Sequence, residues 1–484
     1  MVFFFYSYMI DVVLVNPRTS LQKPDPNVKY SQRMIREPPT GLMILAAILE
    51  NNGYAVEIMD CSIMSNPFDY LRENAHKYRM FGITCLTNTY YQAIQLAKEA
   101  KRFNPSAYII MGGPHVSFQY KEAFQDMPFL DAICIGESEK SFPYLVDQFL
   151  ENSVLDGLYE GIDLSETVNS LGKAYKILSS SNEIPKGIIY SSQTHLDGFT
   201  KGVYNLHSHI DKENTISTAM FPDPTILKEV PQPARHLIQA YNVADVIINR
   251  GCPNNCSFCS RTKLFPTVRV RSLQDVMEEI DQILSISTYK FVNFYDNINL
   301  NKTFYYDFLD ALIERKFQIP WGAELRADAL VERQVEKMKL SSCALIATGV
   351  ESAAPEVLKL NVKNQDPEKV AAGIALLKKH DIAVQAYFVL GLPGETKETF
   401  EQTLEYIRNL PLERGVDKID VFPATPYPGS DLFSKQKEFG LKILNQNFNM
   451  YNCKEIIMET PTLTYKELSK MMDTAKSLKN KLGL

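Results

Sequence analysis

The chain has 484 residues, of which 45% are hydrophobic and 22% are charged, and its formal net charge is -6. These values are typical of a folded globular protein of two or three domains. They give no sign of a basic surface, so we expect no nucleic-acid partner. Eight cysteines in this length exclude a disulfide scaffold and indicate a reducing cytosol.

The first ten residues, MVFFFYSYMI, are apolar but lack the basic start and the small-residue cleavage site of a signal peptide. The run reaches Asp11 long before it could span a bilayer. We therefore predict a cytoplasmic protein, and peripheral association with a membrane through this run stays open. A regular strand-like segment begins at Met9, so both Met1 and Met9 fit as the start of the chain.

Short apolar runs alternate with amphipathic stretches through residues 9–152. The apolar runs are IDVVLV, AVEIMD, MFGITCL, YIIMGG and DAICIG. Pro38 and Pro39 fit the start of a helix over GLMILAAILENN, and Gly53 fits its end. This alternation predicts an α/β domain with a doubly wound parallel sheet of the Rossmann or flavodoxin-like type.

Residues 153–235 lose this alternation and gather Ser, Asn, Asp, Gly and Pro, which predicts a linker. A second alternation follows, with candidate strands VADVIIN, KFVNFYD, IPWGAEL, ALIATGV, IAVQAYFVLG and VDKIDVF. Six β/α units predict a partial (β/α)6 barrel over residues 236–426, with its chemistry at the carboxyl ends of the strands. Residues 427–484 are mostly helical in pattern and are predicted to form a small helical C-terminal region.

Three cysteines, Cys252, Cys256 and Cys259, follow the first predicted barrel strand with the spacing C-x3-C-x2-C. Three thiolates on so short a loop can converge on one soft metal site. A [4Fe-4S] cluster held by three cysteines keeps one iron without a protein ligand. From the spacing alone, a structural zinc site or three ordinary thiols remain open.

Because the loop directly follows a strand and carries Phe258 before its last cysteine, the sequence resembles the radical S-adenosylmethionine (SAM) superfamily. The resemblance implies a [4Fe-4S] cluster on Cys252, Cys256 and Cys259, whose open iron binds SAM. It also implies one-electron cleavage of SAM to a 5'-deoxyadenosyl radical. A low-potential electron donor such as flavodoxin or ferredoxin is then an expected partner.

Other segments resemble SAM-binding motifs of the same superfamily. TGVESA ends the fourth predicted strand, YFVLGLPGET ends the fifth, and AELRA and YDNINLN end the third and second. An isolated Glu351 or Arg326 is more often part of a surface ion pair than a ligand of SAM. The prediction of a SAM site therefore depends on the order of these motifs along the chain. The predicted SAM-binding residues are Phe258, Asp296, Glu324, Arg326, Gly349, Glu351, Gly391 and Gly394.

Residues 9–152 resemble the cobalamin-binding domain of one radical SAM subgroup, which includes BchE-type cyclases and hopanoid methylases. The segments that carry the resemblance are VNP, PPTGLMILAAILENNGY, GITCLTNT, MGGPHVS and IGESE. The D-x-H-x-x-G motif of other cobalamin proteins is absent after Asp60, so the resemblance implies cobalamin without a histidine from that position. A flavodoxin-like domain without a ligand is the alternative. The predicted cobalamin-binding residues are Thr84, Thr87, Asn88, Thr89, Gly112, Gly113, His115, Gly136 and Glu137.

The resemblance implies a cobalamin-dependent C-methyltransferase that acts on an unactivated carbon through a 5'-deoxyadenosyl radical and methylcobalamin. Cyclisation or oxidation without methyl transfer stays open, because relatives with both domains catalyse such reactions. A methylthiotransferase would need a second cluster, for which Cys61, Cys85 and Cys134 are the candidates. A cobalamin carrier or sensor is the non-enzymatic alternative, and the substrate is open between a small molecule, a lipid and a peptide.

Overall fold

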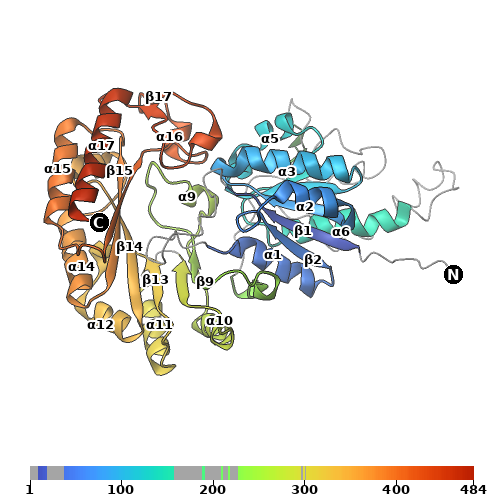
Figure 1. Cartoon of the computed structure of the whole chain (residues 1–484), viewed down its shortest axis with the longest axis horizontal. Coiled ribbons are helices and arrows are strands. Elements are labelled where there is room, and N and C mark those ends of the chain that lie inside the picture. Colours follow the sequence, from blue (N-terminus) through green and yellow to red (C-terminus); the bar gives the residue numbers. More distant parts are fainter. Residues whose placement is uncertain are drawn as a thin grey trace. The chain divides into compact units, whose positions relative to one another are not determined.

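The structure is a computed structural model that describes residues 9–18, 37–156, 188–190, 209–210, 216–217, 227–295, 298–299 and 301–484. The chain divides into two compact units (Figure 1). The first unit comprises Met1–Pro26 and Pro39–Gln239, and the second comprises Asn27–Pro38 and Ala240–Leu484.

The first unit is built on one sheet. Its strands are β1 (Ile10–Asn16), β2 (Val56–Asp60), β3 (Tyr78–Thr84), β4 (Tyr108–Gly112), β5 (Ala132–Cys134), β6 (Ile188–Tyr190), β7 (His209–Ile210) and β8 (Ile216–Ser217). Their order is β2-β1-β3-β4-β5-β6-β8-β7, with the first five mutually parallel and the last three antiparallel. The parallel part has the order typical of flavodoxin-like sheets and confirms the predicted fold class. The three added strands come from residues 153–235.

Helices cover this sheet and bury its apolar side chains. They are α1 (Thr40–Asn51), α2 (Pro67–Asn74), α3 (Tyr90–Phe103), α4 (Pro114–Phe118), α5 (Tyr120–Asp126) and α6 (Ser141–Asp156). Leu14 and Met80 on the strands pack with Leu145 of α6 in one buried cluster. Gly82 allows this close packing, because a Cβ atom there would lie 2.6 Å from Cζ of Phe142.

The second unit is built on a main sheet of six parallel strands, which follow one another in sequence order. These strands are β9 (Val243–Ile247), β12 (Phe291–Tyr295), β13 (Trp321–Glu324), β14 (Cys343–Glu351), β15 (Ala383–Leu390) and β16 (Lys418–Pro423), in the order β16-β15-β14-β13-β12-β9. Two short antiparallel pairs stand apart from it: β10 (Asn249–Arg250) with β11 (Arg269–Val270), and β17 (Lys442–Ile443) with β18 (Met458–Glu459). Within the described residues β9 does not pair with β16, so this is the predicted partial barrel.

The helices of the second unit are α9 (Arg261–Leu264), α10 (Leu273–Ser285), α11 (Lys302–Glu314), α12 (Glu332–Leu340), α13 (Pro355–Leu360), α14 (Pro367–Lys379), α15 (Lys397–Asn409), α16 (Asp431–Ser434) and α17 (Tyr465–Leu482). Buried side chains of α10, α11, α12, α14 and α15 pack on the outer face of the barrel sheet, where they meet Val246, Phe294 and Ile346 in the largest buried cluster of the chain's described part. The C-terminal region contains α17 and also the antiparallel pair β17–β18, so it is less uniformly helical than predicted.

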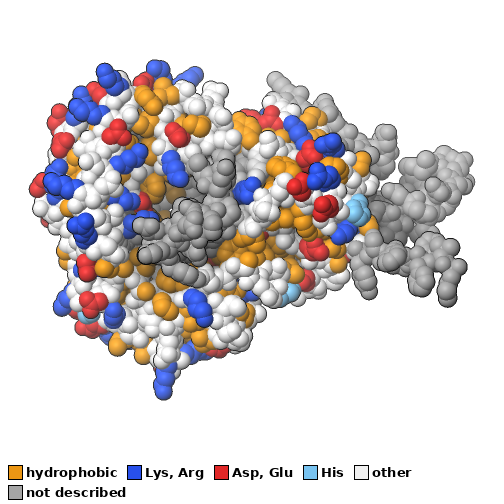
Figure 2. Space-filling view, viewed as in Figure 1, with side chains coloured by type: hydrophobic (Ala, Val, Ile, Leu, Met, Phe, Trp, Pro, Cys, Tyr) orange, Lys and Arg blue, Asp and Glu red, His pale blue; other side chains and the backbone are white. Residues whose placement is uncertain are grey.

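Acidic and basic side chains are interspersed on the face of the second unit seen in Figure 2. Among the described residues, no helix combines the length and the apolar character needed to cross a membrane.

Candidate active site

The cysteine loop runs from β10 to α9, directly after the first barrel strand. Gly251 begins it with φ of +87°, and a Cβ atom there would lie 2.4 Å from the carbonyl oxygen of Thr267. Glycine is therefore required at this turn. The turn leads into Cys252, Cys256 and Cys259, whose thiols are free and half-buried.

Hydrogen bonds and a nearby positive charge around the three sulfur atoms suit a bound cluster. Burial raises the pKa of the Cys256 thiol to about 11, while the nearby Lys363 ammonium lowers it and so favours the thiolate that binds iron. The backbone N–H of Arg261 donates to Cys259 Sγ at 3.4 Å, and Asn254 Nδ2 donates to Cys252 Sγ at 3.6 Å. N–H groups directed at sulfur tune the potential of iron–sulfur sites. This donor set fits a [4Fe-4S] cluster.

A buried polar contact anchors the middle of the loop. Ser257 donates through its backbone N–H to the carbonyl of Asn361 at 3.0 Å and through Oγ to Asn361 Oδ1 at 2.6 Å. Asn361 Nδ2 donates in turn to the carbonyls of Val357 and Pro393, each at 2.9 Å. Asn361 thus joins the cysteine loop to the end of α13 and to the turn after β15.

Replacing Asn361 with leucine is expected to weaken cluster retention, because Ser257 Oγ and the carbonyl of Pro393 would lose buried partners at a cost of about 1–3 kcal/mol each. The variant should retain less than about half of the roughly four irons per chain expected of a [4Fe-4S] site. Iron and sulfide analysis after anaerobic reconstitution and gel filtration measures this. The exposed Asn409→Leu variant is the matched control, and equal iron in both variants would contradict the anchoring role.

An ion pair lies at the carboxyl end of β14, beside the cysteine loop. Glu351 is buried with φ of +64°, and Lys363 Nζ contacts its Oε1 at 2.8 Å. A Cβ atom at Gly349 would lie 2.3 Å from that oxygen, so the glycine makes room for the carboxylate. Burial alone would lower the pKa of Lys363, but Glu351 and Cys256 raise it, so the ammonium stays charged. A strained residue beside charged groups is a mark of a functional site.

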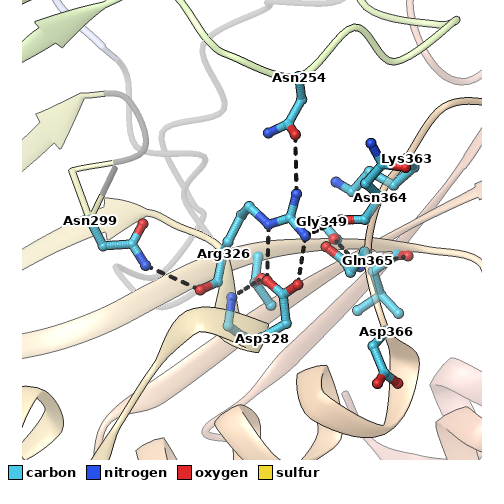
Figure 3. A network of polar contacts seen from close by, with 12 residues as sticks. Asn254, Asn299, Arg326, Asp328, Gly349, Lys363, Asn364, Gln365 and Asp366 are labelled. Carbon is cyan, nitrogen blue, oxygen red and sulfur yellow. Dashed lines mark hydrogen bonds and ion pairs between the residues drawn. The ribbon is translucent and has the colours of Figure 1, made fainter. Parts of the chain in front are cut away.

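Arg326 connects this region to the cysteine loop (Figure 3). Its guanidinium makes a bidentate pair with Asp328 at 2.9 and 2.6 Å, and it donates to Asn254 Oδ1 at 3.4 Å. It also donates to the carbonyl of Asn364. Because Asp328 accepts hydrogen bonds from both Nε and Nη2 of the guanidinium, the geometry indicates that Arg326 supports the cysteine loop. Its predicted contact with SAM stays a prediction.

The turn after β15 has the shape that its glycines suggested. Gly391 and Gly394 have φ of +84° and +85°, and a Cβ atom at Gly394 would lie 2.6 Å from Leu360 Cδ2. The backbone N–H of Gly391 donates to Glu395, which is 1% exposed. Burial raises the pKa of Glu395 to about 8, against the lowering effect of that hydrogen bond.

The remaining predicted SAM-binding residues are spread more widely. Phe258 packs against the apolar cluster that includes Leu392 and Leu432. Glu324 ends β13 with its side chain exposed, and Arg326 follows two residues later, after the end of that strand. Asp296 lies outside the described residues.

The predicted cobalamin-binding residues follow the carboxyl ends of β3, β4 and β5, at one edge of the parallel sheet. Gly113 and Gly136 have φ of +101° and +70°. A Cβ atom at Gly113 would lie 2.9 Å from the backbone N and O of Cys85. Ser117 Oγ donates to the carbonyl of Gly113 and accepts from the N–H of Gly136, so it joins two of the loops. A glycine-lined edge of this kind fits a large ligand that approaches the backbone.

Several of the predicted cobalamin ligands are engaged inside the domain. His115 is 1% exposed, its Nδ1 lies 3.2 Å from Thr87 Oγ1, and its ring lies 4.4 Å from that of Tyr90. Burial lowers the pKa of His115 to about 3, so the imidazole is neutral. Thr89 Oγ1 bonds the backbone of Leu86. The side chains of Thr84 and Asn88 are half-buried, those of Thr87, Thr89, His115 and Glu137 are buried, and Gly112 ends β4.

The sheet order separates the three N-terminal cysteines. Cys61 follows β2, Cys85 follows β3 and Cys134 ends β5, with one strand between each neighbouring pair. Strands are about 4.8 Å apart, so each such pair lies about 10 Å apart. All three thiols are buried, and burial raises the pKa of Cys61 to about 12. This arrangement gives a second cluster on these residues no support.

A cysteine loop at the first strand of a partial barrel, with charged groups at the following strand ends, defines a radical SAM enzyme. The model of the Radical SAM superfamily matches residues 246–407, and the model of the B12 binding domain matches residues 35–146. The chain therefore combines a radical SAM domain with a B12 binding domain, which fits the [4Fe-4S] cluster, SAM and cobalamin expected from the sequence.

Three similar proteins agree with this assignment. An uncharacterized methyltransferase of Pyrococcus horikoshii is 28% identical over 444 residues, which are 90% of this chain and 86% of that protein. The anaerobic magnesium-protoporphyrin IX monomethyl ester cyclase of Rubrivivax gelatinosus is 27% identical over 443 residues, which are 89% of this chain and 71% of that protein. The radical SAM methyltransferase TsrM of Kitasatospora setae, solved with cobalamin and a [4Fe-4S] cluster, shares the fold, with a TM-score of 0.67, 15% identity and coverage of 97% of this chain and 92% of that chain.

Proposed function

We propose that the enzyme is a cobalamin-dependent C-methyltransferase that acts on an unactivated carbon. The observation that carries this proposal is that one chain keeps both the three-thiol loop with its N–H donors and the glycine-lined edge of a B12-type sheet. Similarity over most of both chains to the uncharacterized methyltransferase of Pyrococcus horikoshii supports it. Similarity to a cyclase over nearly the same span makes a reaction without methyl transfer the second candidate.

Each part of the site has a role in this chemistry. When bound, the cluster with SAM supplies a 5'-deoxyadenosyl radical, and cobalamin supplies a transferable methyl group. Cys252, Cys256 and Cys259 hold the cluster. Glu351 and Lys363 place opposite charges beside it, which suits the ammonium and carboxylate groups of the methionine part of SAM.

The proposal predicts that S-adenosylhomocysteine forms without any added substrate. The chain, reconstituted anaerobically with iron, sulfide and hydroxocobalamin, is incubated with a low-potential reductant and SAM that carries a labelled methyl group. We expect label on protein-bound cobalamin and stoichiometric S-adenosylhomocysteine, because a methyltransferase of this class loads its methyl group from SAM. Chromatography of the products measures both.

The outcomes separate the candidate functions. Formation of 5'-deoxyadenosine without S-adenosylhomocysteine would favour a cyclase or oxidoreductase. A reconstituted chain that binds about four irons and no cobalt would indicate that the first unit has a structural role and does not bind cobalamin. A chain that binds about eight irons would indicate a second cluster. Bound cobalamin with no SAM cleavage would favour a carrier or sensor.

A further inference from the structure

Asn254 lies on the cysteine loop between Cys252 and Cys256, and its carboxamide has a partner at each end. Nδ2 donates to Cys252 Sγ at 3.6 Å, a length that suits the large sulfur atom, and Oδ1 accepts from Nη1 of Arg326 at 3.4 Å. Figure 3 shows the second of these contacts. Thr262 Oγ1 donates to the backbone carbonyl of Asn254 at 2.7 Å, so the backbone of this residue is fixed as well. The carboxamide therefore bridges the sulfur of one cluster ligand and a guanidinium.

The chemistry of these two partners determines which way the carboxamide points. A guanidinium has only N–H donors, so it must face the oxygen of the carboxamide. A thiolate sulfur can only accept, so it must face the nitrogen. Arg326 thus fixes the orientation in which Asn254 directs an N–H group at Cys252. A partner that both donates and accepts would impose no such orientation.

Arg326 is itself held at several points. Asp328 accepts from two nitrogens of the guanidinium at 2.9 and 2.6 Å, and the carbonyl of Asn364 accepts from Nη2 as well. Asn299, which is buried, donates through Nδ2 to the backbone carbonyl of Arg326 at 3.2 Å. The hydrogen bonds to Asp328 raise the pKa of Arg326 against the lowering effect of burial, so the guanidinium stays charged. The donor that faces Asn254 is therefore fixed in position and in charge.

An N–H group directed at one sulfur changes how easily a cluster accepts an electron. One electron from a low-potential donor such as flavodoxin or ferredoxin makes the cluster with its three thiolates more negative by one charge. A hydrogen bond to a more negative acceptor is stronger, and hydrogen bonds to the sulfurs are among the features that set cluster potentials. The N–H of Asn254 at Cys252 therefore stabilises the reduced state more than the oxidised state.

We propose that Arg326 is a positioning residue that raises the reduction potential of the cluster through Asn254. Asp328 orients Arg326, Arg326 orients Asn254, and Asn254 donates to the sulfur of Cys252. Asn361 anchors the backbone of the loop independently, so the loop does not depend on this carboxamide for its place. The inference rests on the [4Fe-4S] cluster of the proposed function, and it holds for methyl transfer and for cyclisation alike.

Redox titration of the enzyme reconstituted with iron, sulfide and hydroxocobalamin tests the proposal. The reduced cluster is followed by electron paramagnetic resonance without SAM, so that no electrons are consumed by cleavage. We expect Asn254→Ala to keep about four irons per chain and to lower the equilibrium constant of cluster reduction about three- to tenfold, where tenfold equals about 59 mV for one electron. Asn255→Ala, at an exposed position of the same loop, is the matched control and should keep the potential of the unchanged chain.

Asn254→Asp separates an electrostatic role from a structural one. Aspartate keeps the shape of asparagine and still accepts from Arg326, but it loses the N–H donor and adds a negative charge beside Cys252. The equilibrium constant of reduction should therefore fall more than about tenfold, which is more than about 59 mV. A contact that only supports the loop predicts no change in this variant, so an unchanged potential would overturn the proposal.

A charge-neutral pair of changes tests whether Arg326 acts through Asn254. Arg326→Gln combined with Asp328→Asn removes an ion pair and keeps the net charge, and glutamine does not fix the carboxamide because it both donates and accepts. The pair should lower the constant about threefold in the unchanged chain and less than about 1.5-fold in Asn254→Ala. Equal effects in both backgrounds would overturn the proposal.

Iron content distinguishes failure of this proposal from failure of the proposed function. Loss of iron by Asn254→Ala, with iron retained by Asn255→Ala, would show that the carboxamide is a structural anchor and would overturn the tuning role. An unchanged chain that binds no iron would contradict the proposed function itself. Release of S-adenosylhomocysteine, measured on the same preparation, tests methyl transfer separately from the potential.

Discussion

Replacing Cys256 with alanine is expected to reduce bound iron from about four atoms per chain to fewer than about one and to abolish SAM cleavage. The thiol of Cys256 lies in the middle of the loop, and the adjacent Ser257 is fixed by Asn361. Two remaining thiolates cannot hold a [4Fe-4S] cluster that depends on three protein ligands. Iron and sulfide analysis, the visible spectrum and chromatography of 5'-deoxyadenosine measure the loss.

The matched control for this prediction is Cys453→Ala. Cys453 is a free, half-buried thiol outside the loop, and its Sγ lies 3.1 Å from the hydroxyl of Tyr427. This control should keep the cluster and the cleavage of SAM. Retention of about four irons by Cys256→Ala would show that another residue is the third ligand. Circular dichroism of both variants should match that of the unchanged chain, because the loop lies outside the cores of both units.

The architecture could be predicted because it follows from periodic patterns. Long apolar runs such as IAVQAYFVLG correspond to β15, and the six predicted barrel strands all form parallel strands in chain order. The strands β6, β7, β8, β17 and β18 were not predicted. They are two or three residues long, which is too short for any period to show.

Parts of the site could be predicted only where the residues stand together in the sequence. The three cysteines share one short loop, so their proximity was evident. Lys363 is twelve positions after Glu351, beyond α13, and nothing in the segment NVKNQD distinguishes it from an ordinary surface turn. The left-handed backbone of Glu351 was also not foreseeable, because it follows from an irregular register between β14 and β15 at this point. Tertiary contacts, not local pattern, determine such features.

The polar inner face of the barrel sheet is a third kind of feature. Gln385 and Tyr387 alternate with Val384 and Ala386 of the outer core, so in the sequence they look like the solvent face of a strand. In a parallel sheet that curves into a partial barrel, the face opposite the outer helices turns inward. Alternation alone does not distinguish such an inner face from a solvent-exposed one.

Replacing Glu395 with glutamine is expected to stabilise the protein at alkaline pH. The pKa of Glu395 in the folded chain is about 8, raised from 4.5 by burial. A raised carboxyl pKa means that the folded chain keeps a proton that the unfolded chain releases, so stability falls as pH rises through this interval. The loss approaches about 1.4 kcal/mol per pH unit between pH 4.5 and pH 8 and then levels off. Glutamine keeps an acceptor for the N–H of Gly391 and carries no charge, so it escapes this loss.

Unfolding temperatures of the reconstituted protein, measured anaerobically from pH 5 to pH 9, test this expectation. The variant and the unchanged chain should unfold at similar temperatures near pH 5, and by pH 8 the variant should unfold about 3 °C or more higher. Glu401→Gln, at an exposed position of α15, should show no such pH-dependent difference. A constant difference between Glu395→Gln and the unchanged chain at every pH would mean that Glu395 is ionised throughout. The turn after β15 would then hold a buried charge, and the N–H of Gly391 would be bonding a carboxylate and not a carboxylic acid.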